Sequence, residues 1–315
     1  MKTGIYLSYV GLGANLLHLS YCHEIAKKYG PVTVITLCKN LKETLAHDPL
    51  IREVHYLNKY HKKLTDIFNL SKFLKEFRFN NLLIFYPSLR ISLAAKIAGI
   101  KNILSYPFFN KKNLHLVDAA KSLTEKFLNI ENCKTETSFC FDKNLVENVK
   151  KNFTKGSYKI VIGAGSSGPT TRWGSKNFSD LINILNENGD YFFFILCGPN
   201  EKEIEEKISI NLKKKNFVTL SDKKIKDVIP YLCISNMYIG NDSFGSHITS
   251  QSNIKSIVIL LDSPKAYTDY SKNYYRIGPA GIDINNLTHG TRANPDSIKV
   301  DEVIKLINQI KLRHD

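Results

Sequence analysis

The stretch Gly240-Asn241-Asp242-Ser243-Phe244-Gly245-Ser246-His247 joins a short apolar run, Met237 to Ile239, to the helical-looking segment Ile248 to Gln251. An apolar strand, a turn rich in glycine and hydroxyl residues, and a new helix direct several unpaired backbone N–H groups toward one point. Because the start of a helix also carries partial positive charge, an anionic ligand is stabilised there. The sequence therefore predicts a phosphate-binding turn at this place.

A second turn of the same kind lies upstream, within Val161-Ile162-Gly163-Ala164-Gly165-Ser166-Ser167-Gly168-Pro169-Thr170-Thr171-Arg172-Trp173. Its hydroxyl side chains can donate hydrogen bonds to phosphate oxygens, and the planar guanidinium of Arg172 suits the same oxygens. We expect Trp173 to anchor the helix that follows. Two turns of this type predict a diphosphate ligand, and an ordinary capped turn is the alternative for the second segment.

The order of apolar and amphipathic segments predicts an α/β protein. Strand-length apolar runs occupy residues 5–10, 32–37, 53–57, 82–86, 102–105, 159–163, 191–197, 217–220, 237–240 and 256–261. Apolar residues recur at helical spacing in 16–29, 63–77, 91–98, 178–188, 201–214, 225–233 and 300–312. Alternating β and α units indicate two parallel sheets with helices on both faces.

The length of 315 residues suits two domains. The polar stretch Asn144 to Ser157 is the expected junction, so we predict one Rossmann-like domain over residues 1–150 and a second over 151–315. Each half starts with a strand that runs into a glycine-rich turn. Ligands are therefore expected between the domains, at the carboxyl ends of the strands.

Composition and charge narrow the class of protein. Hydrophobic residues make up 43% of the chain, and no apolar run approaches the ~20 residues of a membrane helix. With no signal peptide at the N-terminus, we expect a soluble cytoplasmic protein. The six cysteines form no C-x-x-C pair, which argues against a zinc site or disulfide framework. The net charge of +15 favours a nucleic acid, an anionic membrane face or a phosphorylated glycolipid as partner, although a lysine-rich composition alone also produces it.

The first glycine turn, Gly11-Leu12-Gly13-Ala14-Asn15, matches only part of the dinucleotide-binding pattern. The third glycine of that pattern would fall on Leu16, and Lys39 stands near the end of the next strand, where an acidic residue is required. A nicotinamide cofactor is therefore not expected. Asn15 and His18 lie one helical turn apart, so both can line the cleft between the domains. Alternatively, Asn15 caps that helix and His18 is a partly buried structural residue.

Two residues of the 240–247 turn have two interpretations each. Asp242 either caps the helix that follows or orients a sugar hydroxyl through its carboxylate. His247 either donates a hydrogen bond to phosphate or packs under the sheet. Both pairs of alternatives stay open from the sequence.

Basic aromatic segments in the first half suit an anionic acceptor or a membrane surface. One is residues 106–113, with Lys111 and Lys112, and the other is residues 68–78. For the latter, a solvated helix face over an apolar core stripe is an equally good interpretation. The polar loop Thr288 to Arg292 is able to reach the cleft, and its role is open.

Taken together, these turns resemble those of the heptosyltransferase-type glycosyltransferases of family 9, whose GT-B architecture has two Rossmann-like domains with parallel sheets facing across a cleft. The segment from Gly163-Ala164-Gly165 to Arg172-Trp173 is similar to the family's P-G-A … K-R-W segment. Asn241-Asp242-Ser243 to His247 is similar to its N-D-[ST]-G-x-x-H segment. The resemblance implies inverting, metal-independent transfer of a heptose or related sugar from a nucleotide diphosphate to a lipopolysaccharide core or similar surface glycan.

The resemblance also implies that the second domain binds the donor and the first the acceptor. The implied donor-binding residues are Gly165, Ser166, Ser167, Thr171, Arg172, Asp242, Ser243, Phe244, Gly245 and His247. For the acceptor we expect Gly13 and Asn15 together with Lys111 and Lys112 of the basic aromatic segment, and as catalytic residues we expect Asn15, His18, Arg172 and Asp242. We expect an ADP-heptose-like donor, an anionic glycolipid or glycan acceptor and peripheral contact with the inner membrane, without a metal, a bound cofactor or nucleic acid.

The sequence departs from the family pattern at three positions. The family's base, an aspartate in the first glycine turn, falls on Asn15, whose amide cannot accept a proton at neutral pH. A family lysine falls on Thr171, which leaves Arg172 as the nearest cation, and a family glycine falls on Phe244. We therefore expect His18 to take the acceptor proton while Asn15 orients the acceptor. The alternative is a GT-B protein that binds a sugar nucleotide or glycan without transfer.

Overall fold

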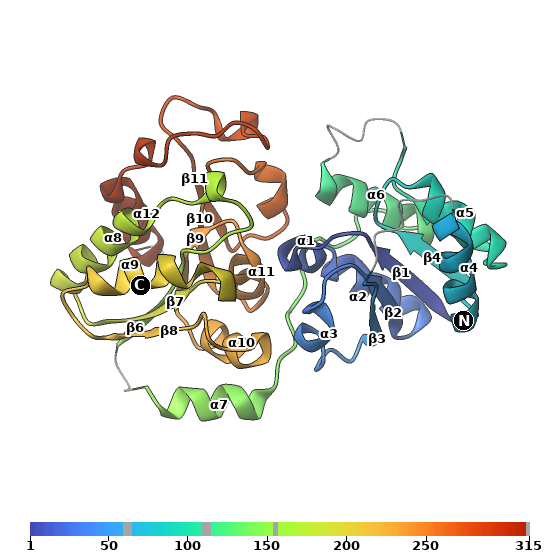
Figure 1. Cartoon of the computed structure of the whole chain (residues 1–315), viewed down its shortest axis with the longest axis horizontal. Coiled ribbons are helices and arrows are strands. Elements are labelled where there is room, and N and C mark those ends of the chain that lie inside the picture. The colour runs from blue at the N-terminus through green and yellow to red at the C-terminus, as the bar shows by residue number, and fades with distance from the viewer. Residues whose placement is uncertain (59–64, 109–114, 154–156, 313–315) are drawn as a thin grey trace. The chain divides into compact units, whose positions relative to one another are not determined.

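The computed structural model describes residues 1–58, 65–108, 115–153 and 157–312. The chain divides into two compact units, Met1–Cys140 and Phe141–Asp315 (Figure 1). No helix of the described residues is long and apolar enough to cross a membrane.

The polar stretch 144–157, expected as a junction, is largely a helix of the second unit. Helix α7 (Lys143–Lys151) begins after Asp142, whose Oδ1 accepts hydrogen bonds from the backbone N–H groups of Asn144 and Leu145. Val146 of this helix is buried, and α7 packs against α10 (Ile225–Cys233). Because most residues of α7 are polar and Val146 is its buried residue, the sequence pattern did not indicate a helix here.

The first unit contains a five-stranded, fully parallel sheet with the order β3-β2-β1-β4-β5. Its strands are β1 (Thr3–Leu7), β2 (Val32–Thr36), β3 (Ile51–Tyr56), β4 (Asn81–Ile84) and β5 (Asn102–Ser105). Its helices are α1 (Leu12–Leu17), α2 (Leu19–Tyr29), α3 (Leu41–Thr44), α4 (Thr65–Phe77), α5 (Leu89–Ile97) and α6 (Leu116–Leu128). The expected single helix 16–29 is broken at His18, which ends α1 and begins α2.

The second unit contains a six-stranded parallel sheet with the order β11-β10-β9-β6-β7-β8. Its strands are β6 (Tyr158–Gly163), β7 (Tyr191–Leu196), β8 (Phe217–Thr219), β9 (Met237–Asn241), β10 (Lys255–Ile259) and β11 (Tyr274–Ile277). Besides α7 and α10, its helices are α8 (Ser175–Glu187), α9 (Lys202–Ile210), α11 (Phe244–Gln251) and α12 (Val300–Leu312). When the strands of this unit are numbered with β6 as the first, their order across the sheet is the order found in the Rossmann fold.

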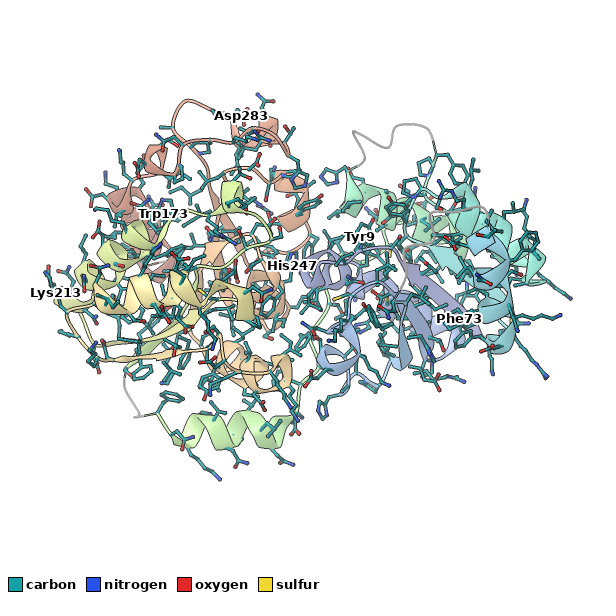
Figure 2. The ribbon with its side chains drawn as sticks, viewed as in Figure 1. Tyr9, Phe73, Trp173, Lys213, His247 and Asp283 are labelled. Carbon is teal, nitrogen blue, oxygen red and sulfur yellow. The ribbon has the colours of Figure 1, made fainter. Side chains whose placement is uncertain are left out.

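In each unit, a hydrophobic core lies between the sheet and the helices that cover one of its faces. In the first unit, Tyr6 and Ile84 pack with Leu70 of α4 and Ala94 of α5. In the second unit, one face carries a core built from α8, α9 and α12, with Trp173 inside it (Figure 2). Both sheets are buried between helices, as the continuous apolar runs of their strands require.

The strand order reverses between β1 and β4 in the first unit and between β6 and β9 in the second. In open α/β sheets, ligands bind outside the carboxyl ends of the strands at such a switch point. The turns after β6 and β9 contain the two predicted phosphate-binding segments. The fold of the second unit therefore brings these two segments to one place.

Candidate functional site

The turns after β6 and β9 meet through a pair of glycines. Gly163 and Gly240 are partners in the β6–β9 register. A Cβ atom on Gly240 would lie 2.5 Å from the Cα atom of Gly163, and one on Gly163 would overlap the hydroxyl of Tyr238. Side chains at either position would force the strands apart, so glycine is needed for the close approach of the two turns.

Asn241 ties the two turns together with its side chain. Its Nδ2 donates to the carbonyl oxygen of Ala164 at 2.7 Å, and its Oδ1 accepts from the backbone N–H of Trp173 at 2.9 Å. Trp173 is itself fully buried and donates from Nε1 to the carbonyl of Ile298. The predicted anchoring role of Trp173 is thus matched by its packing, and Asn241 fixes the end of β9 to both ends of the upstream turn.

The start of helix α11 has no side-chain cap. Its N-cap residue, Ser243, makes a hydrogen bond to the Tyr238 hydroxyl at 3.0 Å instead. Asp242, for which capping was one interpretation, does not cap either. The helix N-terminus that the sequence predicted is therefore present, and neither Ser243 nor Asp242 caps it.

Gly245, implied as a donor-binding residue, lies buried in the first turn of α11. A Cβ atom there would lie 2.5 Å from the side chain of Leu196 and 2.9 Å from the ring of Tyr238. Phe244 beside it is half-buried. The structure thus gives Gly245 a packing function: it lets α11 approach the ends of β7 and β9.

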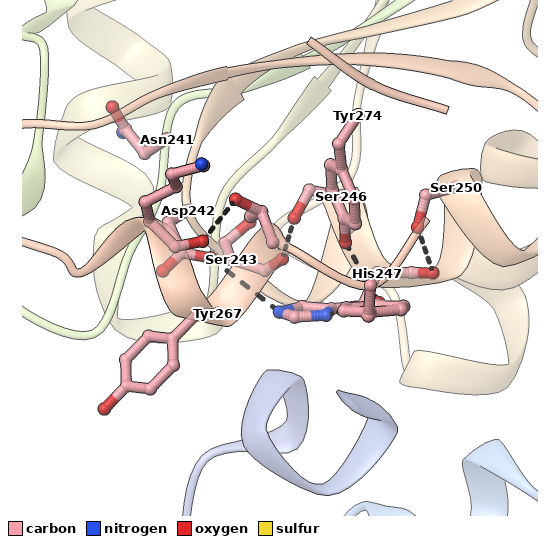
Figure 3. Close-up of polar contacts among 12 residues, drawn as sticks. Asn241, Asp242, Ser243, Ser246, His247, Ser250, Tyr267 and Tyr274 are labelled. Atoms are coloured by element: carbon pink, nitrogen blue, oxygen red, sulfur yellow. Dashed lines mark hydrogen bonds and ion pairs between the residues drawn. The ribbon is translucent and has the colours of Figure 1, made fainter. Parts of the chain in front are cut away.

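Asp242 has the most strongly perturbed carboxyl group of this turn. Burial raises the pKa of Asp242 to about 6, against a hydrogen bond from Ser263 and the charge of His289, which both lower it. Its side chain is 10% exposed, and its Oδ1 lies 3.7 Å from Nε2 of His247 (Figure 3). A carboxyl group with a pKa near neutrality at a switch point has the properties of a functional group.

His247 is buried behind Asp242 and is held from its other side. Its Nδ1 lies 2.8 Å from the hydroxyl of Tyr270, and the two rings are stacked. The Tyr270 hydroxyl in turn lies 3.0 Å from that of Tyr274. This chain of contacts fixes the ring of His247 with its Nε2 edge toward Asp242. The packing interpretation therefore describes the observed contacts, and donation of a hydrogen bond to phosphate stays a prediction.

The turn after β6 differs from the sequence expectation, because no helix begins near Ser166. A short 3-10 turn spans Pro169–Thr171, and α8 starts at Ser175. The backbone N–H of Ser166 donates instead to the carboxylate of Glu201 at 2.9 Å. The same carboxylate accepts from the N–H of Gly198 at 2.7 Å and from Nη2 of Arg172 at 2.7 Å.

Glu201 therefore supplies an anion of the chain itself to the group of donors that we expected to bind phosphate. Arg172 also donates to the carbonyl of Ser166, and its side chain stays 30% exposed. A Cβ atom at Gly165 would collide with the Glu201 carboxylate, so this glycine, too, is needed for packing. Arg172 is the one of these groups that still presents a charged edge to solvent.

The hydroxyl groups of this turn are divided between internal bonds and solvent. Thr171 Oγ1 lies 2.6 Å from Ser166 Oγ and donates to the carbonyl of Gly168 at 2.8 Å. Ser167 is exposed. Thr170 donates to Oδ2 of Asp262 at 2.6 Å.

Asp262 connects the turn after β6 to the polar loop 288–292. Its Oδ1 accepts hydrogen bonds from the backbone N–H groups of Gly290 and Arg292, at 2.7 and 3.0 Å. His289 of the loop lies 2.9 Å from the hydroxyl of Tyr267. The loop whose role the sequence left open is thus part of the same edge of the sheet as Asp242.

In the first unit, the side chain of Asn15 is buried and all its hydrogen-bonding groups are used. Its Nδ2 donates to the carbonyls of Tyr9 and Gly11 at 3.0 and 2.7 Å, and its Oδ1 accepts from Thr36 Oγ1 at 2.7 Å. Gly11, not Asn15, is the N-cap of α1. The capping interpretation is wrong, and Asn15 instead holds the turn after β1 against the end of β2.

His18 is completely buried, and both its ring nitrogens have partners. Nδ1 lies 2.6 Å from the carbonyl of Ala14, and Nε2 lies 2.8 Å from the hydroxyl of Tyr106. Burial lowers the pKa of His18 to about 4. A neutral ring that donates from Nδ1 accepts the Tyr106 hydroxyl at Nε2, which argues against His18 as the group that receives the acceptor proton.

The other residues expected to bind the acceptor are Gly13, Lys111 and Lys112. Gly13 lies half-buried inside α1. Lys111 and Lys112 lie outside the described residues. Within the four described ranges, no three His, Cys, Asp or Glu side chains converge in a way that could hold a metal ion.

Sequence reasoning missed three residues that organise the site: Asn241, Glu201 and Asp262. Glu201 had a partial signal, because Glu three residues after an N-cap position can accept a hydrogen bond from that residue's backbone N–H, as Glu201 does from Gly198. Glycine lacks the side chain that would complete a capping box. Asn241 and Asp262 gave none, since their partners are distant in the sequence.

Comparisons with known proteins agree with this picture of two Rossmann-like units. Residues 87–279 match the model of the family described as glycosyltransferase family 9 (heptosyltransferase). The chain is 22% identical over 218 residues to lipopolysaccharide heptosyltransferase 1 of Campylobacter coli, which covers 67% of the chain and 59% of that relative. The match thus spans less than two thirds of that relative's length.

Two solved structures have the same fold over nearly the whole chain. A glycosyltransferase family 9 protein of Veillonella parvula has a TM-score of 0.81 at 15% identity, covering 99% of this chain and 97% of its own. The ADP-heptose lipopolysaccharide heptosyltransferase II of E. coli has a TM-score of 0.76 at 14% identity, covering 99% of both chains. At these identities the likeness establishes the fold.

Proposed function

The chain belongs to glycosyltransferase family 9, and we propose that it transfers a heptose or a related sugar, with inversion and without a metal ion, from a nucleotide diphosphate donor to a lipopolysaccharide-type or other surface glycan. The two Rossmann-like units are those of the GT-B architecture. An ADP-heptose-like donor is our choice because the E. coli relative is an ADP-heptose enzyme. We propose that the enzyme acts in the cytoplasm, where its nucleotide-sugar donor is available.

One observation carries the proposal: an uncapped helix start and a buried carboxyl group lie side by side at the switch point of the second unit. The N–H groups at the start of α11 can hold diphosphate oxygens. Asp242, at the residue before the N-cap, is ionised for the most part at neutral pH and can accept hydrogen bonds from sugar hydroxyls. A sugar attached to a diphosphate presents both groups to these two partners at once.

In the proposed reaction, an acceptor hydroxyl oxygen forms a bond to the anomeric carbon while the bond from that carbon to the diphosphate oxygen breaks. The hydroxyl proton is released to water, and the diphosphate leaves with the bonding electron pair. Negative charge grows on the departing diphosphate, so donors fixed near it stabilise the transition state more than the ground state. Those donors are the N–H groups at the start of α11 and the exposed edge of Arg172, which Glu201 holds in place. Electrostatic stabilisation then needs no metal at the diphosphate.

The second candidate function is binding of a sugar nucleotide or glycan without transfer. The contacts of Asn15 favour it, because an amide with three hydrogen bonds to the chain cannot accept the proton of an acceptor hydroxyl. His18 is buried and neutral at physiological pH, so it does not replace the missing carboxylate. Only a measurement of product distinguishes the two functions.

The test combines nucleotide binding with product formation. Thermal unfolding is followed with ADP, UDP, GDP and ADP-heptose, because a ligand that binds the folded state alone raises the midpoint. We expect ADP and ADP-heptose to raise it, and Arg172→Gln to lose most of the rise while Lys176→Gln, on the exposed face of α8, keeps it. If none of the four ligands raises the midpoint, the donor site is wrong. Binding without transfer to any lipopolysaccharide-core acceptor would support the second function instead.

A further inference from the structure

Helix α5 of the first unit has two apolar faces. Ile91, Ala94 and Ala95 point into the core. Leu89, Leu93 and Ile97 lie on the outside and are 67%, 46% and 47% exposed. Because their spacing is four residues, these three side chains form one continuous stripe along the helix. A surface helix normally needs only one apolar face, so the outer stripe calls for a partner.

Cations flank this stripe. The helix itself contains Arg90 and Lys96 and no acidic residue. Its end and the end of α4 border an open hollow of about 320 Å³, to which Lys75, Arg78 and Lys101 contribute. Within the described part of the chain, none of these last three side chains forms an ion pair with a carboxylate.

The first unit as a whole is also positively charged. Residues 1–140 contain 20 lysines and arginines against 10 aspartates and glutamates, which is a net charge of +10 out of the +15 of the chain. Helix α4, which packs against α5, adds Lys72 and an exposed Phe68. An apolar stripe edged by cations on a positively charged unit matches the chemistry of an anionic lipid surface.

We propose that the outer face of α5 lies on an anionic lipid bilayer, with Leu89, Leu93 and Ile97 in the boundary between headgroups and acyl chains and lipid phosphates at the hollow beside Lys75, Arg78 and Lys101. A protein partner would need a broader apolar area than one three-residue stripe. The surface is distinct from the sugar-donor site, and lipid binding does not depend on the proposed transfer. It would, however, hold the enzyme where a glycolipid acceptor is displayed.

Sedimentation with lipid vesicles tests the apolar half of the proposal. The full chain is mixed with phosphatidylcholine vesicles that either contain or lack phosphatidylglycerol. We expect binding to the anionic vesicles, and a loss of roughly tenfold or more in the combined variant Leu89→Ser, Leu93→Ser, Ile97→Ser. The matched control is Ile210→Ser, at an 81% exposed isoleucine on α9, which should bind as the unchanged protein does.

Single charge changes test the other half. Lys75→Gln and Lys101→Gln should each weaken binding to anionic vesicles about fivefold at low salt, since one cation near such a surface contributes about that factor. The matched control is Lys207→Gln, on α9, whose lysine is paired with Glu203. Added inorganic phosphate should compete only weakly with vesicles, because it can enter the hollow but cannot replace the contact of the apolar stripe with lipid.

A position-specific readout covers variants that fold poorly. The sequence has one tryptophan, Trp173, and it is buried, so Leu93→Trp adds a single exposed fluorophore. Brominated acyl chains should quench its emission, whereas they should leave an Ile210→Trp variant unquenched. The proposal is overturned if Leu93→Trp is not quenched, if the serine variant binds vesicles as well as the unchanged protein, or if that variant loses only a concentration-dependent association between protein molecules.

Discussion

The carboxylate of Glu201 accepts a hydrogen bond from the backbone N–H of Ser166 over 2.9 Å. This bond joins the turn after β6 to the turn after β7, and it occupies the backbone N–H of Ser166, which we expected to contact phosphate. The same carboxylate holds Arg172, so the one cation of the turn is positioned by an acid of the chain itself. The proposed diphosphate site at Arg172 therefore depends on Glu201, although the ligand need not contact that residue.

We predict that Glu201→Gln lowers the free energy of unfolding by about 1–3 kcal/mol. The glutamine amide must turn an NH₂ group toward the N–H of either Ser166 or Gly198, so one buried donor loses its acceptor. Urea denaturation measures the loss. The control is Glu203→Gln, at an exposed residue paired with Lys207, which should change stability by less than about 0.5 kcal/mol. Equal effects of the two variants would contradict the assigned role of Glu201.

Most of the strands could be predicted because they are buried on both faces and thus read as continuous apolar runs. Strand β5 was predicted with its observed bounds, and β6 began one residue earlier than expected. β11 (Tyr274–Ile277) was missed, since a four-residue edge strand that is mostly half-buried has little apolar signal. Helix α6 was missed although its sequence has an amphipathic spacing, so its signal was present.

The candidate site could be predicted only where its residues are adjacent in the sequence. The 240–247 turn leads into a helix as expected, because glycine, serine and the flanking apolar run specify it locally. The turn at 163–173 did not form the expected helix start, because Asn241 and Glu201, distant in the chain, take up its backbone groups. Hydrogen bonds between residues so distant in the sequence depend on the order of the strands in the sheet, which the local sequence pattern does not specify.

We predict that Asn15→Asp does not create a catalytic base. The new carboxylate would face the carbonyl oxygens of Tyr9 and Gly11, which lose the two N–H donors they now have. Stability should fall by about 1–3 kcal/mol, and sugar transfer should not increase. Thermal unfolding and a transfer assay measure the two effects. Asn69→Asp, on the exposed face of α4, is the control for adding a charge. A gain of transfer in Asn15→Asp would show that the turn rearranges to present a base.

Asp242→Asn should stabilise the protein and impair the enzyme. Because the folded-state pKa of Asp242 is about 6 and its ordinary value is 3.8, the ionised group opposes folding at neutral pH, by at most about 3 kcal/mol. That cost disappears as pH falls from about 6 to about 4, where the folded protein already holds the proton. The variant should therefore be more stable than the unchanged protein at pH 7 and equal to it near pH 4.

Urea denaturation at the two pH values measures this difference. Asp180→Asn, at a partly exposed aspartate paired with Lys176, is the control for removing a surface carboxylate and should not stabilise the protein at pH 7. In the transfer assay, Asp242→Asn should lose activity at every pH. The unchanged enzyme should lose activity as pH falls through about 6, where the carboxylate takes up its proton. A variant that is no more stable at pH 7 would contradict the assigned burial of Asp242.

His18 should have the opposite effect on acid stability. Its folded-state pKa is about 4 and its ordinary value is 6.5, so the unfolded chain binds the proton first as pH falls. The neutral buried ring thus contributes stability above pH 6.5 that is lost progressively toward pH 4, by at most about 3 kcal/mol. His18→Phe keeps the ring contacts with Tyr9 and Phe85 but removes the titration. It should be less stable at pH 7, because the carbonyl of Ala14 loses the His18 ring N–H and the hydroxyl of Tyr106 keeps only its longer contact with the carbonyl of Leu116. Its stability should change less between pH 7 and pH 4.5 than that of the unchanged protein. The exposed His47→Gln is the control; if it and His18→Phe have the same pH dependence, His18 is not buried in the neutral form.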